Sequence, residues 1–199
     1  MPNNEYLPFA SKILEVIPHT SIEYTFRMAY DGAVTPGQFF EVSLPKYGEA
    51  PISVSGIGDG FIDLTIRRVG KVTNEVFAHY VGDSLLLRGP YGNGFDLDDY
   101  RGKDLIVVAG TGLSPVRGVI DHFAMHPKER GTMTLICGFK TPQDILFRDD
   151  LKRWQQHLDL ILTVDDATGD STIREGLVTQ YIPELTLNDS AHTAAIVVG

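Results

Sequence analysis

The sequence has one cysteine, few basic residues and no long hydrophobic run, and each of these shortages excludes a class of protein. Cys137 alone cannot form an internal disulfide, and an iron–sulfur cluster usually takes four thiolates. The net charge of −9 argues against a nucleic-acid partner. No apolar stretch approaches the ~20 residues of a membrane helix, and the first residues lack the basic and apolar regions of a signal peptide. We therefore predict a cytoplasmic protein with no nucleic-acid and no membrane partner.

Two kinds of catalytic site are also missing from the sequence. A serine hydrolase would carry a Gly-x-Ser-x-Gly segment after a strand, and the chain has none. His122 and His126 lie four residues apart without an adjacent glutamate or a third ligand, so a surface helix face explains them better than a metal site. We predict no metal ligands in this chain.

The first half of the chain has the pattern of an antiparallel sheet. Short apolar or alternating runs, such as residues 39–44 and 61–66, are separated by turn residues at 35–37 and 56–60. This pattern predicts an antiparallel β-barrel or sandwich.

The second half changes to longer spacings. Its apolar runs do not alternate, and the segments between them are long enough for helices. We expect an α/β domain with a parallel sheet, and a boundary near residues 98–103 that gives domains 1–100 and 101–199. The last run is expected to be an interior strand, which suggests that the natural protein continues past Gly199. The predicted strands cover residues 104–109, 132–137, 158–164 and 194–198.

A glycine turn follows the first of these strands. Gly110 and Gly112 let the backbone approach a pyrophosphate, Ser114 is expected to cap a helix over 116–125, and Pro115 suits its first position. A helix N-terminus favours an anion. The segment departs from the full GxGxxG fingerprint, so a tight strand-to-helix connection without a ligand remains the alternative.

Five segments occur in the order found in one known superfamily. They are residues 36–39, 51–53, 66–73 and 89–95, followed by the glycine turn. Together they resemble the ferredoxin–NADP reductase superfamily, most closely the B component of anaerobic sulfite reductase. The gamma subunits of NAD(P)-linked hydrogenases and the electron-transfer subunit of dihydroorotate dehydrogenase are similar.

The resemblance implies that the barrel binds FAD. It places the Ser53 hydroxyl near flavin N5, as the one catalytic contact, and it makes Gly70, Val72 and Thr73 a second diphosphate loop. Arg67 or Arg68 would supply the positive charge that the two phosphates of FAD need. Relatives often have an arginine at the position of Ala50 and an aromatic residue at that of Ile52. The absence of both would weaken FAD retention. The residues implied at the flavin are Pro51, Ile52, Ser53, Val54, Thr65, Ile66, Arg67, Arg68, Gly70, Val72 and Thr73.

The resemblance also implies that the second domain binds a nicotinamide dinucleotide. Members that choose NADPH carry Ser-Arg after the third strand, where this chain has Asp165 and Asp166, so we predict NADH. A solvated acidic loop is the alternative at these two positions. Cys137 is either a nicotinamide contact or a small core residue, and Phe147 is expected in the core. The residues implied at this ligand are Gly110, Thr111, Gly112, Leu113, Ser114, Pro115, Cys137, Gly138, Asp165 and Asp166.

The implied activity is electron transfer from NADH through FAD to a partner. The cofactors carry the reactivity, so no acid–base pair is required. The partners implied are iron–sulfur and siroheme-type subunits of a hetero-oligomer that reduces sulfite, with hydrogenase and dihydroorotate dehydrogenase complexes as alternatives. The [2Fe–2S] centre of these relatives lies in a C-terminal segment that is absent from this sequence. A flavin or nucleotide sensor without turnover is a further alternative.

Overall fold

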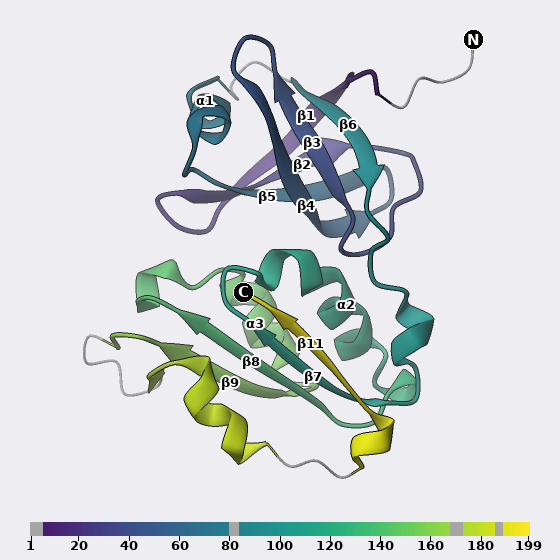
Figure 1. The fold of residues 1–199 in the computed structure, drawn as a ribbon, viewed down its shortest axis with the longest axis vertical. Coiled ribbons are helices and arrows are strands. Elements are labelled where there is room, and N and C mark those ends of the chain that lie inside the picture. The colour runs from purple at the N-terminus through teal and green to yellow at the C-terminus, as the bar shows by residue number, and fades with distance from the viewer. Residues whose placement is uncertain (1–5, 80–83, 168–172, 186–188) are drawn as a thin grey trace. The chain divides into compact units, whose positions relative to one another are not determined.

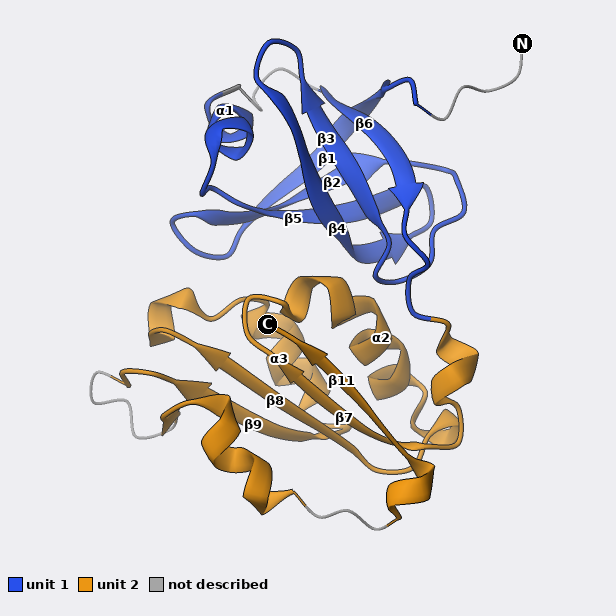
Figure 2. Ribbon diagram, in the orientation of Figure 1, with its two compact units in different colours: residues 1–95 blue, residues 96–199 orange. Residues whose placement is uncertain are grey.

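A computed structural model of the 199-residue chain describes all residues except 1–5, 80–83, 168–172 and 186–188. The chain forms two compact units, residues 1–95 and 96–199, coloured separately in Figure 2. Each unit has its own sheet. In the part of the chain that is described, no helix is long and apolar enough to cross a membrane.

The first unit is a closed antiparallel barrel (Figure 1). Its strands follow the order β1-β2-β5-β4-β3-β6 around the barrel. This confirms the antiparallel fold predicted from the alternating runs. The strands are β1 (Phe9–Pro18), β2 (Glu23–Ala29), β3 (Phe39–Leu44), β4 (Gly48–Gly58), β5 (Phe61–Arg67) and β6 (Ser84–Tyr91).

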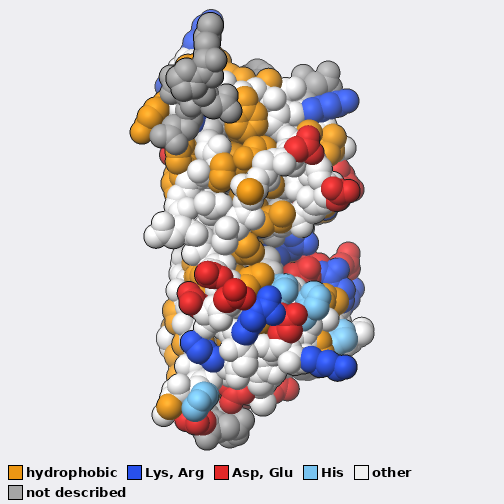
Figure 3. Space-filling view, turned by 90° about the vertical axis from the view of Figure 1, so that its right-hand side faces the viewer, with side chains coloured by type: hydrophobic (Ala, Val, Ile, Leu, Met, Phe, Trp, Pro, Cys, Tyr) orange, Lys and Arg blue, Asp and Glu red, His pale blue; other side chains and the backbone are white. Residues whose placement is uncertain are grey.

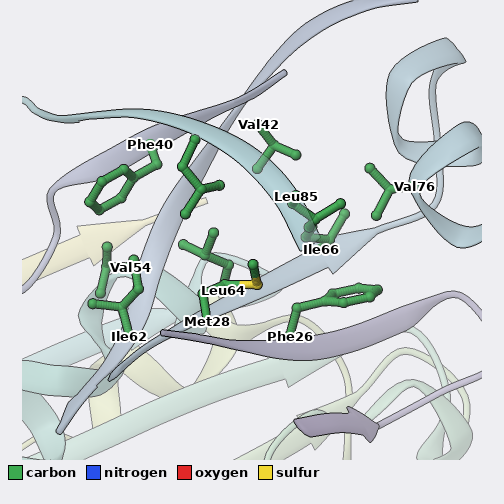
Figure 4. Packing of buried hydrophobic residues seen from close by; sticks show 11 residues of the cluster. Phe26, Met28, Phe40, Val42, Val54, Ile62, Leu64, Ile66, Val76 and Leu85 are labelled. Carbon is green, nitrogen blue, oxygen red and sulfur yellow. The ribbon is translucent and has the colours of Figure 1, made fainter. Parts of the chain in front are cut away.

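Alternate side chains of these strands fill the barrel. Phe26 and Met28 of β2 meet Leu64 of β5 in a cluster that excludes water (Figure 4). Burial of one such side chain contributes about 1.5–3 kcal/mol. The helix α1 (Lys71–His79) adds Val76, which is 1% exposed, to the same cluster.

The start of α1 corrects the loop expected at residues 70–73. Val72 and Thr73 lie in the first turn of the helix. The Thr73 hydroxyl accepts hydrogen bonds from the N–H groups of Val69 and Gly70, at 3.1 and 2.9 Å, and so stabilises the helix start. The sequence pattern did not reveal a helix here because glycine, lysine and threonine suit a turn equally well.

Two of the motifs noted in the sequence meet at the end of the barrel. Phe95 N–H donates to the Pro36 carbonyl at 2.7 Å. Gly94 has φ +71°, and a Cβ on it would lie 2.8 Å from the same carbonyl oxygen, so only glycine fits.

The second unit has a five-stranded parallel sheet in the order β10-β9-β8-β7-β11 (Figure 1). This confirms the predicted α/β domain. The strands are β7 (Asp104–Ala109), β8 (Met133–Phe139), β9 (Asp159–Val164), β10 (Arg174–Glu175) and β11 (Thr193–Val198). The helices are α2 (Leu113–Met125) and α3 (Arg148–Trp154), and the 3-10 turns are η2 (Leu97–Tyr100), η3 (Pro127–Glu129), η4 (Pro142–Asp144), η5 (Val178–Glu184) and η6 (Ser190–His192).

The helix α2 buries one face because its apolar residues recur at helical spacing. Val116, Val119, Ile120 and Phe123 are all 0% exposed. On α3, Trp154 is also 0% exposed, and its indole N–H donates to Asp121 of α2 at 3.0 Å.

Among the described residues β11 pairs with β7 alone, and Val197 is 72% exposed. The interior position expected for this strand stays a prediction. One sequence expectation for this unit is wrong. The helix α2 begins at Leu113 with Gly112 as its N-cap, three residues before the expected start, so Ser114 and Pro115 lie inside the first turn and Ser114 does not cap it. Apolar Leu113 starts the buried stripe earlier than the capping pattern suggested.

Candidate nucleotide and flavin sites

A pocket of about 250 Å³ lies at the carboxyl edge of the parallel sheet. After β7 the chain adds strands on one side of the sheet, and β11 then returns to the other side of β7. Ligands of open α/β sheets bind at such a reversal of strand order. The pocket is lined by Val108, Ala109, Gly110, Gly138, Thr163, Asp165, Leu177, Val178, Val197, Val198 and Gly199.

Three of the predicted nucleotide residues, Gly110, Gly138 and Asp165, line this pocket. They follow or end three neighbouring strands, and the parallel register brings them to one edge. The remaining predicted residues are outside the pocket lining. These are Thr111, Gly112, Leu113, Ser114, Pro115, Cys137 and Asp166.

The glycine turn is shaped by its contact with β11. A Cβ on Gly112 would lie 2.7 Å from Val198 Cγ1 and 2.8 Å from the Val198 carbonyl oxygen, which no real side chain tolerates. The start of α2 has no side-chain cap. Leu113 N–H donates to the Gly110 carbonyl at 3.1 Å, and Pro115 has no N–H. The helix dipole, more than a row of free donors, is therefore what favours an anion at this helix start.

Asp165 and Asp166 follow β9 directly and are both exposed. Their N–H groups donate to the carbonyls of Phe139 and Lys140, at 3.0 and 3.2 Å, which continues the pairing of β9 with β8. The backbone of both residues is thus fixed, and Asp165 borders the pocket.

Sequence reasoning missed a buried polar group among the residues that line this pocket. Thr163 is 0% exposed, and its Oγ1 has no hydrogen-bond partner among the described residues. Burying an unsatisfied hydroxyl costs about 1–3 kcal/mol. Thr163 is the one hydroxyl in the apolar run of β9, and that exception was the available clue. The wall formed by Leu177 and Val178 had no such clue.

Cys137 lies in the core of the second unit. It is 0% exposed, and burial raises the pKa of its thiol to about 12. The side chain is a neutral thiol under ordinary conditions. Phe147 is 4% exposed, in keeping with its expected place in the core.

On the barrel, the residues implied at the flavin lie on opposite faces of β4. Val54 is 2% exposed in the core, and half-buried Ile52 packs against the same cluster. Pro51 is exposed and Ser53 is half-buried on the other face, because successive side chains of a strand alternate. Ser53 is in register with Phe39 of β3. Only Pro51 and Ser53 therefore present side chains outside the barrel.

The implied residues of β5 divide in the same way. Ile66 is 0% exposed in the core. The Thr65 hydroxyl lies 2.7 Å from the hydroxyls of both Thr25 and Ser55. Arg67 is 3.3 Å from Glu23, with half of its side chain exposed.

Arg68 and the start of α1 lie beyond the end of β5 and form a further candidate region for the FAD phosphates. The Arg68 guanidinium lies 5.8 Å from the centre of the Phe77 ring. Gly70 is exposed, and a Cβ on it would have only the Thr73 hydroxyl within 4 Å, at 3.9 Å. The space in front of the α1 N-terminus is therefore open to a ligand.

Charged and histidine side chains gather on the second unit, whereas the visible face of the first is mostly apolar or uncharged (Figure 3). His122 and His126 stack at 4.5 Å between ring centres, and His122 Nε2 lies 2.9 Å from Glu129. Arg101 also pairs with Glu129. Among the described residues no group of three or more His, Cys, Asp or Glu could hold a metal ion.

Comparison with known proteins gives the class first. Residues 106–199 match the oxidoreductase NAD-binding domain family. The fold matches the cytochrome b5 reductase domain of Ulva prolifera nitrate reductase, with a TM-score of 0.81 and 20% identity over 98% of this chain and 88% of that one. A ferredoxin NADP+ reductase from Neisseria gonorrhoeae gives 0.78 and 18%, over 96% and 84%. The chain has the two-domain fold of the ferredoxin–NADP reductase-like superfamily.

Particular relatives within that superfamily are more similar in sequence. Sulfhydrogenase 1 subunit gamma of Pyrococcus furiosus is 36% identical over 163 residues, which are 76% of this chain and 56% of that protein. The probable electron transfer subunit of dihydroorotate dehydrogenase B (NAD(+)) of Thermoplasma volcanium is 32% identical over 158 residues, 79% of this chain and 57% of that protein. The chain thus spans somewhat more than half the length of these relatives.

Proposed function

We propose that this chain is the flavin- and nicotinamide-binding part of an electron-transfer subunit, which takes electrons from NADH through FAD to a partner redox protein. One observation carries the proposal: the pocket at the carboxyl edge of the parallel sheet, bordered by Gly110, Gly138 and Asp165. Strand order and glycine placement there suit a dinucleotide. The proposed domains are residues 1–100 for FAD and 101–199 for the nucleotide.

The residues at the sheet edge fit a nicotinamide dinucleotide. Gly110 lines the pocket beside the start of α2, which suits the pyrophosphate, and Gly112 lets β11 approach this turn closely. Asp165 and Asp166 would accept hydrogen bonds from a free ribose 2′-hydroxyl and repel a 2′-phosphate, which supports NADH over NADPH. Thr111, Leu113, Ser114, Pro115, Cys137 and Gly138 complete the proposed set, with Leu113, Ser114 and Cys137 acting through packing because their side chains are buried.

The outer face of the barrel fits FAD at two places. The open space before Gly70 and the N-terminus of α1 suits a diphosphate, with Arg67 or Arg68 as its counter-charge. Pro51 and Ser53 would border the flavin ring, since they point out of the barrel. Ile52, Val54, Thr65, Ile66, Val72 and Thr73 would support these groups from within the barrel wall and the first turn of α1.

Bound FAD would accept a hydride equivalent from NADH and release electrons one at a time. The chain's own residues would bind and orient the two cofactors and exclude water from them. The Ser53 side chain lies on the outer face of β4, where its hydroxyl would be placed to donate to a ring nitrogen. No proton-transfer pair is assigned.

The relatives support a hydrogenase or a dihydroorotate dehydrogenase as the partner assembly better than a sulfite reductase. We therefore place the first two ahead of sulfite reduction on a siroheme protein. Like the partners, the iron–sulfur centre is a proposal, and its ligands would lie outside these 199 residues because the chain has one cysteine.

Anaerobic titration tests the electron-transfer role. The full chain is loaded with FAD and titrated with NADH or NADPH while the flavin absorption band is followed. We expect bleaching by NADH at concentrations about tenfold lower than by NADPH. A flavin that stays oxidised with saturating NADH would exclude electron transfer and favour a nucleotide sensor.

Co-purification with partners tests the assembly. A complex isolated from the source cells is assayed for NADH-linked turnover of hydrogen, dihydroorotate and sulfite. Turnover of hydrogen or dihydroorotate is expected, and turnover of sulfite alone would restore the sulfite reductase assignment.

A further inference from the structure

The Thr163 hydroxyl is the buried polar group that the proposed site leaves without a role. The residue is 0% exposed, and Oγ1 has no hydrogen-bond partner among the described residues. Buried hydroxyl groups are normally paired, because an unpaired one destabilises the folded state. An exception of this kind at a ligand pocket points to a partner that arrives with the ligand.

The hydroxyl borders the space that Gly138 leaves in the pocket. Gly138 is opposite Thr163 in the register of β8 and β9. A Cβ on Gly138 would lie 3.0 Å from Thr163 Oγ1 and 2.5 Å from Val178 Cγ1. All three residues line the pocket, so a side chain at position 138 would fill the space beside the hydroxyl.

The surrounding groups indicate which half of a dinucleotide lies here. Asp165, two residues after Thr163, borders the pocket and can only accept hydrogen bonds when ionised. Leu177 and Val178 form an apolar wall. A nucleoside offers hydroxyls to the carboxylate, a flat base to the apolar wall, and acceptor atoms to a hydroxyl donor.

We propose that Thr163 is a positioning residue for the adenosine half of the nicotinamide dinucleotide, to which Oγ1 donates a hydrogen bond. This inference rests on the proposed function and adds a specific contact to it. Thr163 and Asp165 then divide the polar recognition: the first donates to an acceptor of adenosine, and the second accepts from its ribose.

Thr163→Val tests the proposal because valine has the same shape without the hydroxyl. Isothermal titration calorimetry on the full chain would use NADH, 5′-AMP as the adenosine half, and nicotinamide mononucleotide as the other half. We expect Thr163→Val to weaken binding of NADH and 5′-AMP by about three- to tenfold and to leave nicotinamide mononucleotide unchanged. Thr163→Ser, which keeps the hydroxyl, should bind 5′-AMP within about twofold of the wild type.

A melting experiment without ligand separates positioning from a structural role. If the hydroxyl lacks a partner in the free protein, Thr163→Val should raise Tm by about 2–4 °C while it lowers affinity. The matched control is Thr134→Val, which lies on β8 at the end away from Gly138. It should change neither Tm nor the affinity for NADH and 5′-AMP.

The outcomes distinguish this inference from the function beneath it. Wild-type protein that binds neither NADH nor 5′-AMP would overturn both. Wild-type binding that Thr163→Val leaves intact would overturn the role of Thr163 alone. A loss of affinity for nicotinamide mononucleotide in place of 5′-AMP would overturn the assignment to the adenosine half.

Discussion

The barrel and the parallel-sheet unit place their proposed site residues in different ways. On β4 and β5 of the barrel, every second proposed site residue, such as Ile66, belongs to the core. In the other unit Gly110 and Asp165 lie just after strands, where they border an open pocket. A site at the end of a sheet is therefore visible as space and as an unpaired hydroxyl, whereas a site on a strand face is visible only through the direction of its side chains.

The largest expected effect comes from truncating the core of either unit. Trp154→Ala should lower the free energy of unfolding of residues 96–199 by about 3–5 kcal/mol, and Phe26→Ala should do the same for residues 1–95, because both side chains are 0% exposed. Hydrogen exchange measured by mass spectrometry reports each unit separately. Loss of protection in both units from either change would mean that they unfold as one.

The next effect concerns the glycine turn. Gly112→Ala brings a Cβ within 2.8 Å of the Val198 backbone, so we expect a loss of about 1–3 kcal/mol and at least a tenfold weaker binding of NADH. Chemical denaturation and calorimetry measure the two quantities.

The control is Gly102→Ala, which has a positive φ of +74° but nothing within 4 Å of the added Cβ. It should lose stability through backbone strain and keep its affinity for NADH. Equal affinity in wild type and Gly112→Ala would show that the turn is only a connection between strand and helix.

A smaller effect is expected at the acidic pair after β9. Asp165→Ser combined with Asp166→Arg should shift the ratio of NADPH to NADH affinity by about tenfold toward NADPH, since a cation replaces a carboxylate near the ribose. Asp149→Arg combined with Asp59→Ser, at two exposed acids away from β9, makes the same change of net charge and serves as the control. An unchanged ratio would support the alternative of a solvated acidic loop.

The smallest effect is expected at Cys137. Burial raises its pKa to about 12 from an ordinary thiol value near 9, so the folded protein at pH 8 should react with iodoacetamide roughly a thousandfold more slowly than the unfolded chain. Stability should be independent of this group below pH 9 and fall between pH 9 and 12, where the unfolded thiol ionises first. Rapid alkylation of folded protein would mean that the thiol reaches solvent, as a nicotinamide contact would.

The sequence predicted whole elements better than their ends. The apolar runs at residues 104–109 and 158–164 became β7 and β9 within one residue, because strands covered on both faces need continuous apolar side chains. The start of α2 was missed because a serine before an apolar stretch suits a cap, whereas packing set the true start at Leu113. Local sequence preferences cannot decide between a capping residue and tertiary packing as the factor that sets a helix start.

The pocket was predictable only in part. Gly110 and Asp165 follow strands, so their common edge could be inferred from the parallel order. The wall at Leu177 and Val178 comes from a segment whose position depends on tertiary packing, and no local pattern marked it. The unpaired state of Thr163 could not be known before its neighbours were placed.

The alternation of Ile52, Ser53 and Val54 on β4 decides which changes of length this protein can accept. Deleting one residue there would turn Ser53 toward the barrel interior and move two aliphatic side chains into water, because a shift of one position exchanges the faces of a strand. Lengthening the turn at Asp59 and Gly60 would leave the alternation of side chains on β4 unchanged. Insertions should therefore survive laboratory evolution at the hairpin and be eliminated within the preceding strand.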